Sequence, residues 1–226
     1  MEFSGKKVTV VGTGISGIGA VGLLNAVGAE VVLYDGNEKL KIEDIEKKLG
    51  TYKAEIVLGE LTKELTDSSD LLVISPGVPI DSPVVKAFEA AGVPVWGEVE
   101  LAYAFDKGKV LAITGTNGKT TTTALVGQIV GAYHKDTFVV GNIGNPYTTE
   151  VLKSNKDSYT VAEISSFQLE TVHEFHPLVS AILNITPDHL NRHYTMDCYV
   201  QTKEKIAMNQ KGSEVCVLNF DDDYLR

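Results

Sequence analysis

The sequence has little cysteine and no long apolar run. Its 226 residues include two cysteines, Cys198 and Cys216, which are too few for the disulfide framework of a secreted domain and suit a reducing compartment. No stretch approaches the roughly 20 apolar residues that are needed to cross a bilayer, and the first residues contain no apolar signal segment. We therefore expect a cytoplasmic protein without a membrane partner.

Positive charge is also scarce. The chain carries 20 Lys and Arg residues against 30 Asp and Glu residues, which gives a formal net charge of -10. A surface of this sign repels nucleic acid and anionic membranes, so neither is expected as a partner. Phosphate ligands are not excluded, because the amides of one loop and a single lysine bind phosphate locally. We expect the chain to be a monomer.

Short apolar runs alternate with helical segments along the chain. The expected strands are Lys7–Val11, Glu30–Tyr34, Glu55–Leu58, Leu71–Ile74 and Val93–Trp96 in the first part, and Lys109–Thr114, Phe138–Val140, Tyr159–Glu163, Val179–Asn184 and Val215–Leu218 in the second. The main expected helices are one that ends near Val27 and others at Glu38–Leu49, Pro83–Ala91 and Thr120–Ala132. Apolar runs that are separated by helices and closed by Gly or Pro are typical of parallel, doubly wound sheets.

The pattern therefore predicts an α/β fold with two domains in tandem. The first covers residues 1–97 and the second covers residues 98–226, with residues 98–108 as the connection. The chain ends shortly after an expected strand, where a doubly wound domain usually continues. The second domain is therefore expected to be incomplete.

The first glycine-rich loop, Gly12–Gly17, has the sequence GTGISG and lies between an expected strand and an expected helix. This is the G-x-G-x-x-G fingerprint of Rossmann-like domains, and Asp35 follows at the end of the next strand, where an acidic residue meets a ribose hydroxyl. Glycines let the backbone approach a diphosphate, and the helix N-terminus supplies amides. The loop fits a nicotinamide dinucleotide, a UDP-sugar, or a tight turn without a ligand.

The second glycine-rich loop, Gly115–Thr120, has the sequence GTNGKT and ends like a P-loop. In such loops the lysine contacts the β- and γ-phosphates of a nucleotide and the hydroxyl of the next residue ligates Mg²⁺. The strict pattern would need glycine where this chain has Ile113. The β-branched residues Thr121–Thr123 are poor helix formers at an expected helix start, and local choices that oppose propensity tend to mark functional sites. We therefore predict a P-loop-type α/β domain that binds ATP.

Two phosphate-binding loops on consecutive domains imply two phosphorylated ligands. An NAD-dependent oxidoreductase, the main alternative from another class, would explain the first loop and leave the second without a role. A non-catalytic nucleotide-binding module is a third hypothesis. These alternatives differ in the ligand that they predict for the first domain.

Several segments resemble one known family. The string ITGTNGKTTTT at residues 113–123 resembles the ATP loop of the Mur ligases and of the folylpolyglutamate synthases. Segments similar to successive signatures of the D-glutamate-adding Mur ligases are SPGVP at 75–79, GE and EL at 97–101, GNIG at 141–144, EISSFQLE at 163–170 and NITPDHL at 184–190. The resemblance covers essentially the whole chain in family order. A first domain of this kind argues against the folate enzymes, and a sister Mur ligase with another amino-acid substrate stays an alternative.

The resemblance implies an ATP-dependent ligase of peptidoglycan precursor synthesis that joins D-glutamate to UDP-N-acetylmuramoyl-L-alanine. In this family the alanine carboxylate attacks the γ-phosphoryl group of ATP, which gives an acyl phosphate and ADP. The amine of D-glutamate then displaces phosphate. ATP and Mg²⁺ are the implied cofactors, and the two substrates are the implied partners.

The resemblance also implies roles for individual residues. Those expected to bind ATP are Gly115, Thr116, Asn117, Gly118, Lys119, Thr120 and Thr121. Those expected to bind the UDP-sugar are Gly14, Ile15, Ser16, Asp35, Gly77 and Asn142. The expected metal ligands are Thr120, Glu163, His189 and Lys203, the last after carbamylation, and the expected catalytic residues are Lys119, His189 and Lys203.

Without the resemblance, some of these residues have simpler interpretations. Lys203 would be a solvated lysine on a helix, and His189 would form hydrogen bonds at a helix start. Ser165 and Ser166 would either contact a metal-bound phosphate or cap the next helix.

The chain departs from the family in three respects. Gly36 and Asn37 follow Asp35 where some relatives carry longer or cationic side chains, and Asn191 stands where aspartate is common. The family's C-terminal domain, which binds D-glutamate, is absent from these 226 residues. We therefore expect a truncated form that binds the UDP-sugar, binds ATP weakly and does not ligate on its own.

Overall fold

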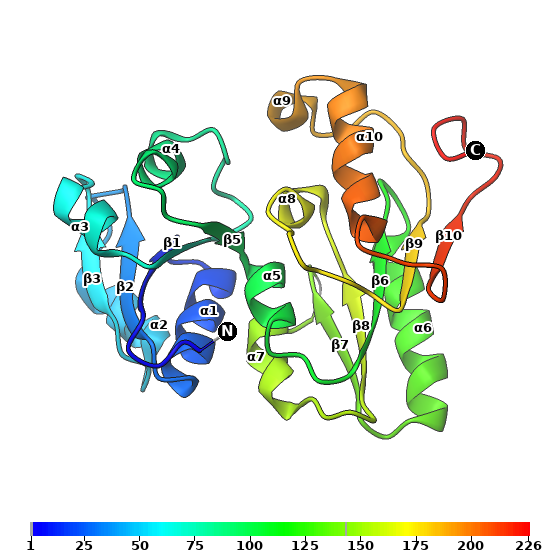
Figure 1. The fold of residues 1–226 in the computed structure, drawn as a ribbon, viewed down its shortest axis with the longest axis horizontal. Helices are drawn as coiled ribbons and strands as arrows, with labels where there is room; N and C mark the ends of the chain where they lie inside the picture. The colour runs from blue at the N-terminus through cyan, green and yellow to red at the C-terminus, as the bar shows by residue number, and fades with distance from the viewer. Residues whose placement is uncertain (1, 143) are drawn as a thin grey trace.

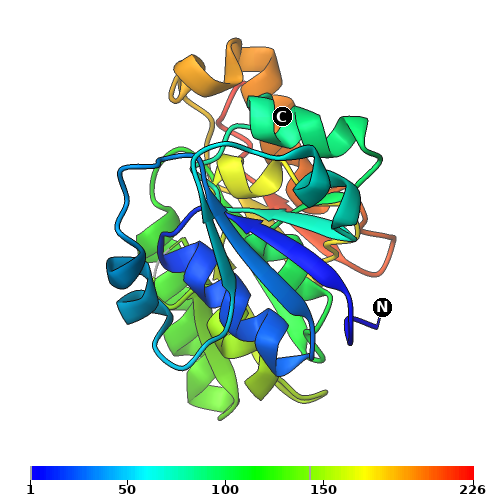
Figure 2. The ribbon, with the colours of Figure 1, turned by 90° about the vertical axis from the view of Figure 1, so that its left-hand side faces the viewer.

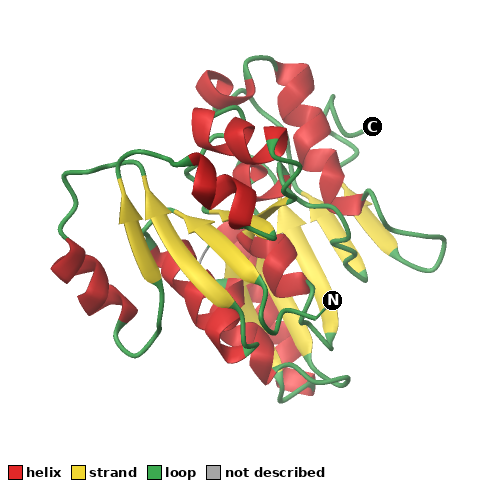
Figure 3. Ribbon diagram, turned by 60° about the vertical axis from the view of Figure 1, so that its left-hand side comes forward, coloured by secondary structure: helices red, strands yellow, loops and turns green. Residues whose placement is uncertain are grey.

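Two parallel β-sheets form the framework of the protein. The computed structural model describes residues 2–142 and 144–226. In spatial order, the first sheet consists of β3 (Glu55–Leu58), β2 (Glu30–Asp35), β1 (Lys7–Val11), β4 (Leu71–Ile74) and β5 (Val95–Gly97). The second consists of β10 (Val215–Leu218), β9 (Val179–Ile182), β6 (Lys109–Thr114), β8 (Tyr159–Glu163) and β7 (Thr137–Gly141). The two sheets lie side by side (Figures 1 and 3), so the predicted α/β fold is confirmed.

Helices connect the strands and cover the sheets. The helices of the first domain are α1 (Ile15–Ala26), α2 (Ile42–Leu49), α3 (Lys63–Ser68) and α4 (Pro83–Ala90). The helices that follow are α5 (Glu98–Tyr103), α6 (Lys119–Tyr133), α7 (Tyr147–Glu150), α8 (Ser166–Leu169), α9 (Leu190–His193) and α10 (Met196–Glu204), with 3-10 turns η1 (Val151–Lys153) and η2 (Lys205–Ala207). Figure 2 shows α1 across one face of the first sheet. Within the described ranges, no helix combines the length and apolar character that a membrane span requires.

The central strands form where the sequence is continuously apolar. All four residues of β4 are buried, and so are four of the five residues of β1 and of β8. Strands of a parallel sheet are covered on both faces, which is why they appear as apolar runs rather than as alternating patterns. The edge strand β10 differs, because all four of its residues are exposed.

Some expected boundaries were wrong by a few residues. The helix expected from Glu38 begins at Ile42, because the side chain of Asn37 accepts a hydrogen bond from the backbone N–H of Lys39 and holds a turn there. The strand expected at Val93–Trp96 covers Val95–Gly97, and the strand expected to reach Asn184 ends at Ile182.

The strand register aligns the carboxyl ends of neighbouring strands. In the first sheet Val11 pairs with Tyr34 on one side and with Ile74 on the other. In the second sheet Ile113 pairs with Glu163, and Thr114 pairs with Ile182. The loops after β1, β2 and β4 therefore leave the first sheet at one edge, and those after β6, β8 and β9 leave the second sheet at one edge. Ligands of doubly wound folds bind at such an edge.

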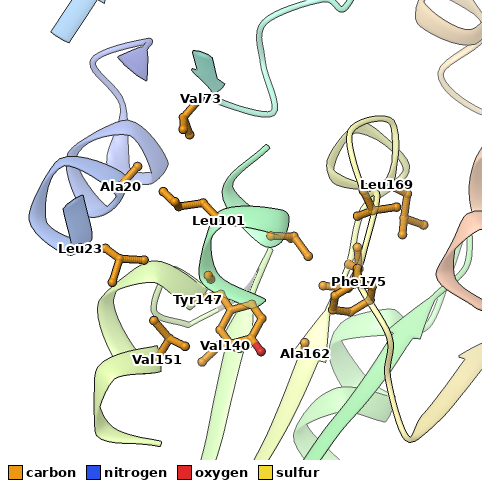
Figure 4. Packing of buried hydrophobic residues seen from close by; sticks show 14 of the residues in the cluster. Ala20, Leu23, Val73, Leu101, Val140, Tyr147, Val151, Ala162, Leu169 and Phe175 are labelled. Atoms are coloured by element: carbon orange, nitrogen blue, oxygen red, sulfur yellow. The ribbon is translucent and has the colours of Figure 1, made fainter. Parts of the chain in front are cut away.

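The segment expected as a simple connection contains a buried helix. Residues 98–102 of α5 are all buried. Leu101 has no exposed surface, and it belongs to a hydrophobic cluster with members from both domains. Figure 4 shows it between Val73 of the first domain and Tyr147 of the second. The two domains therefore share one core at their junction.

Two buried carboxylates on α5 connect it to the second domain. Glu98 accepts hydrogen bonds from the backbone N–H of Thr148 at 3.0 Å and from the side chain of Gln168 at 3.3 Å. Burial raises the pKa of Glu98, although these donors oppose the shift. Glu100 accepts three backbone N–H groups from residues 173–175, at 2.7 to 3.2 Å. Both carboxylates are thus satisfied by local donors, as burial requires.

The shared core gives a first testable prediction. Leu101→Ala should lower the free energy of unfolding by about 2–5 kcal/mol, because it removes buried methyl groups and leaves a cavity. Leu125→Ala is the matched control: Leu125 is 55% exposed on α6, and the expected change is within about 0.5 kcal/mol. Urea unfolding followed by circular dichroism measures both. Equal losses in the two variants would contradict the assignment of α5 to the core.

Candidate nucleotide-binding sites

The second glycine-rich loop joins the end of β6 to the start of α6. Gly115 and Gly118 have φ values of +150° and +81°, a region that favours glycine. A Cβ atom on Gly115 would lie 3.1 Å from the Cβ atom of Leu183, so the loop packs closely on the segment after β9. No side chain caps the N-terminus of α6, and its first turn contains no acidic residue. The first amides of this 15-residue helix are therefore available to an anion.

Asn184 holds the loop in place. Its Oδ1 atom accepts a hydrogen bond from the backbone N–H of Asn117 at 2.8 Å, and its Nδ2 atom donates to the carbonyl of Asn117 at 3.0 Å. The Thr116 hydroxyl accepts from the backbone N–H of Thr186 at 3.0 Å. Sequence reasoning gave Asn184 no role of its own. The signal was its position two residues after β9, a strand that neighbours β6.

Two lysines converge on the same carbonyl group of this loop. The Nζ atom of Lys119 donates to the carbonyls of Gly115 and Thr116, both at 3.0 Å. The Nζ atom of Lys203, from α10, donates to the carbonyl of Gly115 at 2.9 Å. Burial and the positive charge of Lys119 lower the pKa of Lys203 to about 7, against a weaker opposing effect of Asp188. Lys203 is 1% exposed, so it is not the solvated lysine of the simpler interpretation.

Glu163 lies at the end of β8 and is 1% exposed. Its Oε1 atom accepts a hydrogen bond from Nδ2 of Asn142 at 2.8 Å. Its Oε2 atom is buried and has no hydrogen-bond partner among residues 2–142 and 144–226, and the same holds for the hydroxyls of Thr114 and Thr123. A buried carboxylate oxygen without a partner is costly, and hard cations prefer such oxygen ligands.

The other predicted metal ligands lie on different elements. Thr120 is exposed in the first turn of α6, as is Thr121, which is predicted to bind ATP. His189 has a φ of +53° and lies 3.4 Å from Asp188, measured between Nε2 and Oδ2. No group of three or more His, Cys, Asp or Glu side chains gathers as a metal site in the part of the chain that the structure describes. The assignment of metal ligands stays a prediction.

The first glycine-rich loop lies at the carboxyl edge of the first sheet. A Cβ atom on Gly17 would lie 1.9 Å from the carbonyl oxygen of Gly12, so only glycine allows α1 to pack this closely on the loop. The Thr13 hydroxyl donates to Asp35 at 3.1 Å. Gly77 belongs to the turn after β4, which the hydrogen bond from the N–H of Val78 to the carbonyl of Ser75 closes at 2.9 Å. The strand register therefore brings the predicted residues of this domain to one edge.

Comparison with known proteins identifies the family. Residues 6–97 match the N-terminal domain of MurD-like Mur ligases, and residues 113–226 match the Mur ligase middle domain. The chain belongs to the Mur ligase family.

Curated Mur ligases are similar over the whole chain. The chain is 70% identical over 225 residues to the UDP-N-acetylmuramoylalanine–D-glutamate ligase of Lachnospira eligens, an alignment that covers 100% of this chain and 50% of that protein. It is 58% identical over 227 residues to the ligase of the same name from Lachnoclostridium phytofermentans, again over 100% of this chain and 50% of the relative. The chain thus spans about half the length of these relatives.

A solved structure has the same fold. The crystal structure of UDP-N-acetylmuramate:L-alanyl-gamma-D-glutamyl-meso-diaminopimelate ligase from Neisseria meningitides is similar with a TM-score of 0.60 and 17% sequence identity. The match covers 98% of this chain and 73% of that one. At this identity the likeness shows the fold alone. The family that the chain matches is one of ligases, not of oxidoreductases.

A cavity of about 640 Å³ lies where the two domains of this Mur ligase chain meet. Its walls come from α1 and α2 of the first domain and from the segment around α7 of the second. Of the six residues predicted to bind the UDP-sugar, Gly14 and Ile15 line it. The lining residues are Thr13, Gly14, Ile15, Ile18, Gly19, Lys48, Tyr52, Asn145, Pro146, Thr149 and Glu150. Ile143, within the GNIG segment of the family, lies outside the described residues.

The two serines after β8 have structural roles. Ser165 caps α8 in a capping box with Gln168, which agrees with the capping interpretation. The Ser166 hydroxyl lies 2.9 Å from Nε2 of His193, and both residues are buried. Burial lowers the pKa of His193, against the opposing charge of Glu170. Sequence reasoning gave no role to His193 or Glu170, because the residues that each of them contacts are distant along the chain.

The lowered pKa of Lys203 predicts a pH dependence of stability. Above pH 7 the folded state releases the Lys203 proton, whereas the unfolded state keeps it up to its ordinary pKa of 10.5. The unfolded state then binds more protons, so the free energy of unfolding should rise with pH, by at most about 1.4 kcal/mol per unit. Urea unfolding between pH 7 and 9 measures this slope. Lys203→Met should remove it.

Lys47→Met is the control for this experiment, because the Lys47 side chain is 77% exposed on α2. This variant should keep the slope of the unmodified chain. A Lys203→Met variant with the same slope as the control would show that Lys203 titrates in the folded state as it does in the unfolded state.

Proposed function

We propose that this chain forms the UDP-sugar-binding and ATP-binding part of a Mur ligase that joins D-glutamate to UDP-N-acetylmuramoyl-L-alanine. The observation that carries the proposal is the pair of glycine-rich loops, one at the carboxyl edge of each sheet in the same chain. Two such loops imply two phosphorylated ligands. The names of the relatives at 70% and 58% identity support the choice of substrates.

The first domain is proposed to bind the UDP-sugar. Gly14, Ile15 and Ser16 begin α1, whose N-terminus has no side-chain cap and no acidic residue in its first turn. This arrangement suits a diphosphate. Asp35 would meet a ribose hydroxyl. A Cβ atom on Gly77 would meet no other atom within 4 Å, so the turn after β4 has room for a ligand. Asn142 lies on the second sheet and is proposed to contact the sugar–peptide arm.

The second domain is proposed to bind ATP. The amides at the start of α6 would hold its phosphates, and residues 115–121 would surround them. Lys119 now donates to two loop carbonyls, and a phosphate group is a stronger acceptor for its ammonium group. The Nζ atom of Lys203 donates to one of these two carbonyls, that of Gly115. A phosphate at this position would give Lys119 a charged partner, and the place of Lys203 beside the same loop supports the assignment of both as catalytic residues.

The residues fit a divalent cation. Glu163 offers a buried oxygen without a partner, and Thr120 offers a hydroxyl in the first turn of α6. Mg²⁺ would supply positive charge beside the phosphate oxygens. His189 and Lys203 are the proposed ligands of a second cation. A pKa of about 7 leaves much of the Lys203 amine neutral, as carbamylation requires.

The proposed reaction begins at the carboxylate of the alanine residue. This carboxylate attacks the γ-phosphoryl group of ATP, with release of ADP, and the amine of D-glutamate then displaces phosphate and loses a proton. Lys119 stabilises the charge on the transferred group, and the two domains align the reactants. We propose that these 226 residues, which span half of the relatives, do not complete the reaction alone.

Calorimetric titration tests the ligand of the first domain. UDP-N-acetylmuramoyl-L-alanine should bind, UMP should bind more weakly, and NADH should give no heat. UMP lacks the second phosphate and the sugar–peptide arm. NADH has a diphosphate but also lacks that arm, which is proposed to reach residues of the second domain. Binding of NADH in place of the muramoyl nucleotide would overturn the proposal and favour an oxidoreductase.

A second titration tests the ATP site. The chain should bind ATP weakly in the presence of Mg²⁺, and Lys119→Ala should weaken binding by at least about tenfold, because a charge-assisted contact with phosphate is lost. In the same samples phosphate release should not depend on D-glutamate.

Lys47→Ala, on the exposed face of α2, is the control and should bind ATP as the unmodified chain does. An unchanged affinity of Lys119→Ala for ATP would contradict the assignment of residues 115–120 as a P-loop. D-glutamate-dependent phosphate release by the unmodified chain would show that the 226 residues suffice for ligation.

A further inference from the structure

A second contact between the domains lies away from the shared core. The guanidinium group of Arg192, on α9, donates from Nη2 to the carbonyl of Val78 in the first domain at 2.9 Å. The hydroxyl of Tyr194 donates to the carboxylate of Asp81. In Figure 1, α9 lies well above α5 and α7, where the core joins the two domains. The shared core around α5 and the hydrogen bonds of Arg192 and Tyr194 therefore join the two domains at different places along their junction.

Arg192 is held rigidly from its own domain. Its Nε atom donates to Oε1 of Glu170 at 3.1 Å, and its Nη2 atom donates to Oε2 of the same carboxylate. Its guanidinium carbon lies 4.9 Å from the centre of the Phe167 ring. The side chains of Arg192 and Glu170 are 12% and 5% exposed. A planar guanidinium that is paired with a carboxylate and stacked on a ring has little freedom left, so its bond to Val78 has a set direction.

The two ends of this contact belong to the two proposed substrate regions. Val78 closes the turn that contains Gly77, a residue proposed to bind the UDP-sugar. At the other end, the ring of His189 packs on the same Phe167 ring as Arg192, with the ring centres of His189 and Phe167 4.9 Å apart. Arg192 thus connects the turn after β4 with α9, the helix that directly follows His189.

We propose that Arg192 is a positioning residue, which fixes the turn at residues 75–79 against α9 so that one ligand can contact both domains at once. The inference rests on the proposed function, because it assumes a substrate that extends from the first domain into the second. Such a ligand gains affinity only if the two half-sites keep one separation. A ligand that fills only the first domain gains nothing from the contact.

The test compares two ligands on one variant. Arg192→Lys keeps the positive charge, but a single ammonium group cannot bond both oxygens of Glu170 and the carbonyl of Val78 in the same geometry. In calorimetric titrations the affinity for UDP-N-acetylmuramoyl-L-alanine should fall about tenfold, the effect of roughly one lost hydrogen bond. The affinity for UMP should stay within about twofold, since UMP reaches the first domain only.

The matched control is the chain's other arginine. Arg226→Lys alters an exposed side chain, and both affinities should stay as in the unmodified chain. An equal loss of both affinities in Arg192→Lys would overturn the proposal, because it would show damage to the first domain itself. Unchanged affinity for the muramoyl nucleotide would also overturn it.

A readout without ligand separates this inference from the proposed function. Spin labels on Lys63→Cys of α3 and on Cys216 of β10, in a Cys198→Ser background, report the distance between the domains. This distance distribution should be narrow in the background chain, should broaden with Arg192→Lys and should broaden less with Tyr194→Phe. If the background chain fails to bind the muramoyl nucleotide, the proposed function fails, and an unchanged distribution in Arg192→Lys would overturn the positioning role independently.

Discussion

The burial of α5 between the two sheets determines how the rest of the molecule is arranged. Leu101 takes part in the cores of both domains, and the two carboxylates of the same helix need hydrogen-bond donors in a place that excludes water. Those donors come from Thr148, from Gln168 and from the backbone of residues 173–175. The helix α7 and the segment after α8 are therefore positioned by α5. Because the connection is part of the core, the carboxyl edges of the two sheets take defined places relative to one another.

The local charge at the second glycine loop contrasts with that of the whole chain. The net charge is -10, yet Lys119 and Lys203 meet at the carbonyl of Gly115. Nearby, Glu163 has a buried oxygen without a partner among the described residues. Each of these features is unfavourable by itself, because like charges repel and a desolvated carboxylate loses its hydration. An anionic phosphate and a cation would satisfy them together, which is why the strain lies where the ligands are proposed to bind.

The fold was predictable to the extent that its signals are local. The apolar runs of β1, β4, β6 and β8 gave strands with the expected bounds, because central parallel strands are buried on both faces. The glycines of both loops were also local signals, because few residues other than glycine fit a positive φ value or a helix that packs closely on a loop. The short helices α7, α8 and α9 were not predicted individually. Helices of four residues are not stable alone, and they exist here through contacts with distant residues.

The sequence by itself determined the alternation of strands and helices, the two phosphate-binding loops and the resemblance to a ligase family, because these depend on residues within a few positions of one another. Only the tertiary structure decided that Lys203 reaches a carbonyl 88 residues away in the chain, that Asn184 holds the second loop, and that Arg192 bonds the turn at Val78. These contacts depend on how sheets, helices and domains pack. The sequence around a polar side chain looks the same whether that side chain faces solvent or bonds a partner. Only its burial in the folded chain distinguishes the two cases.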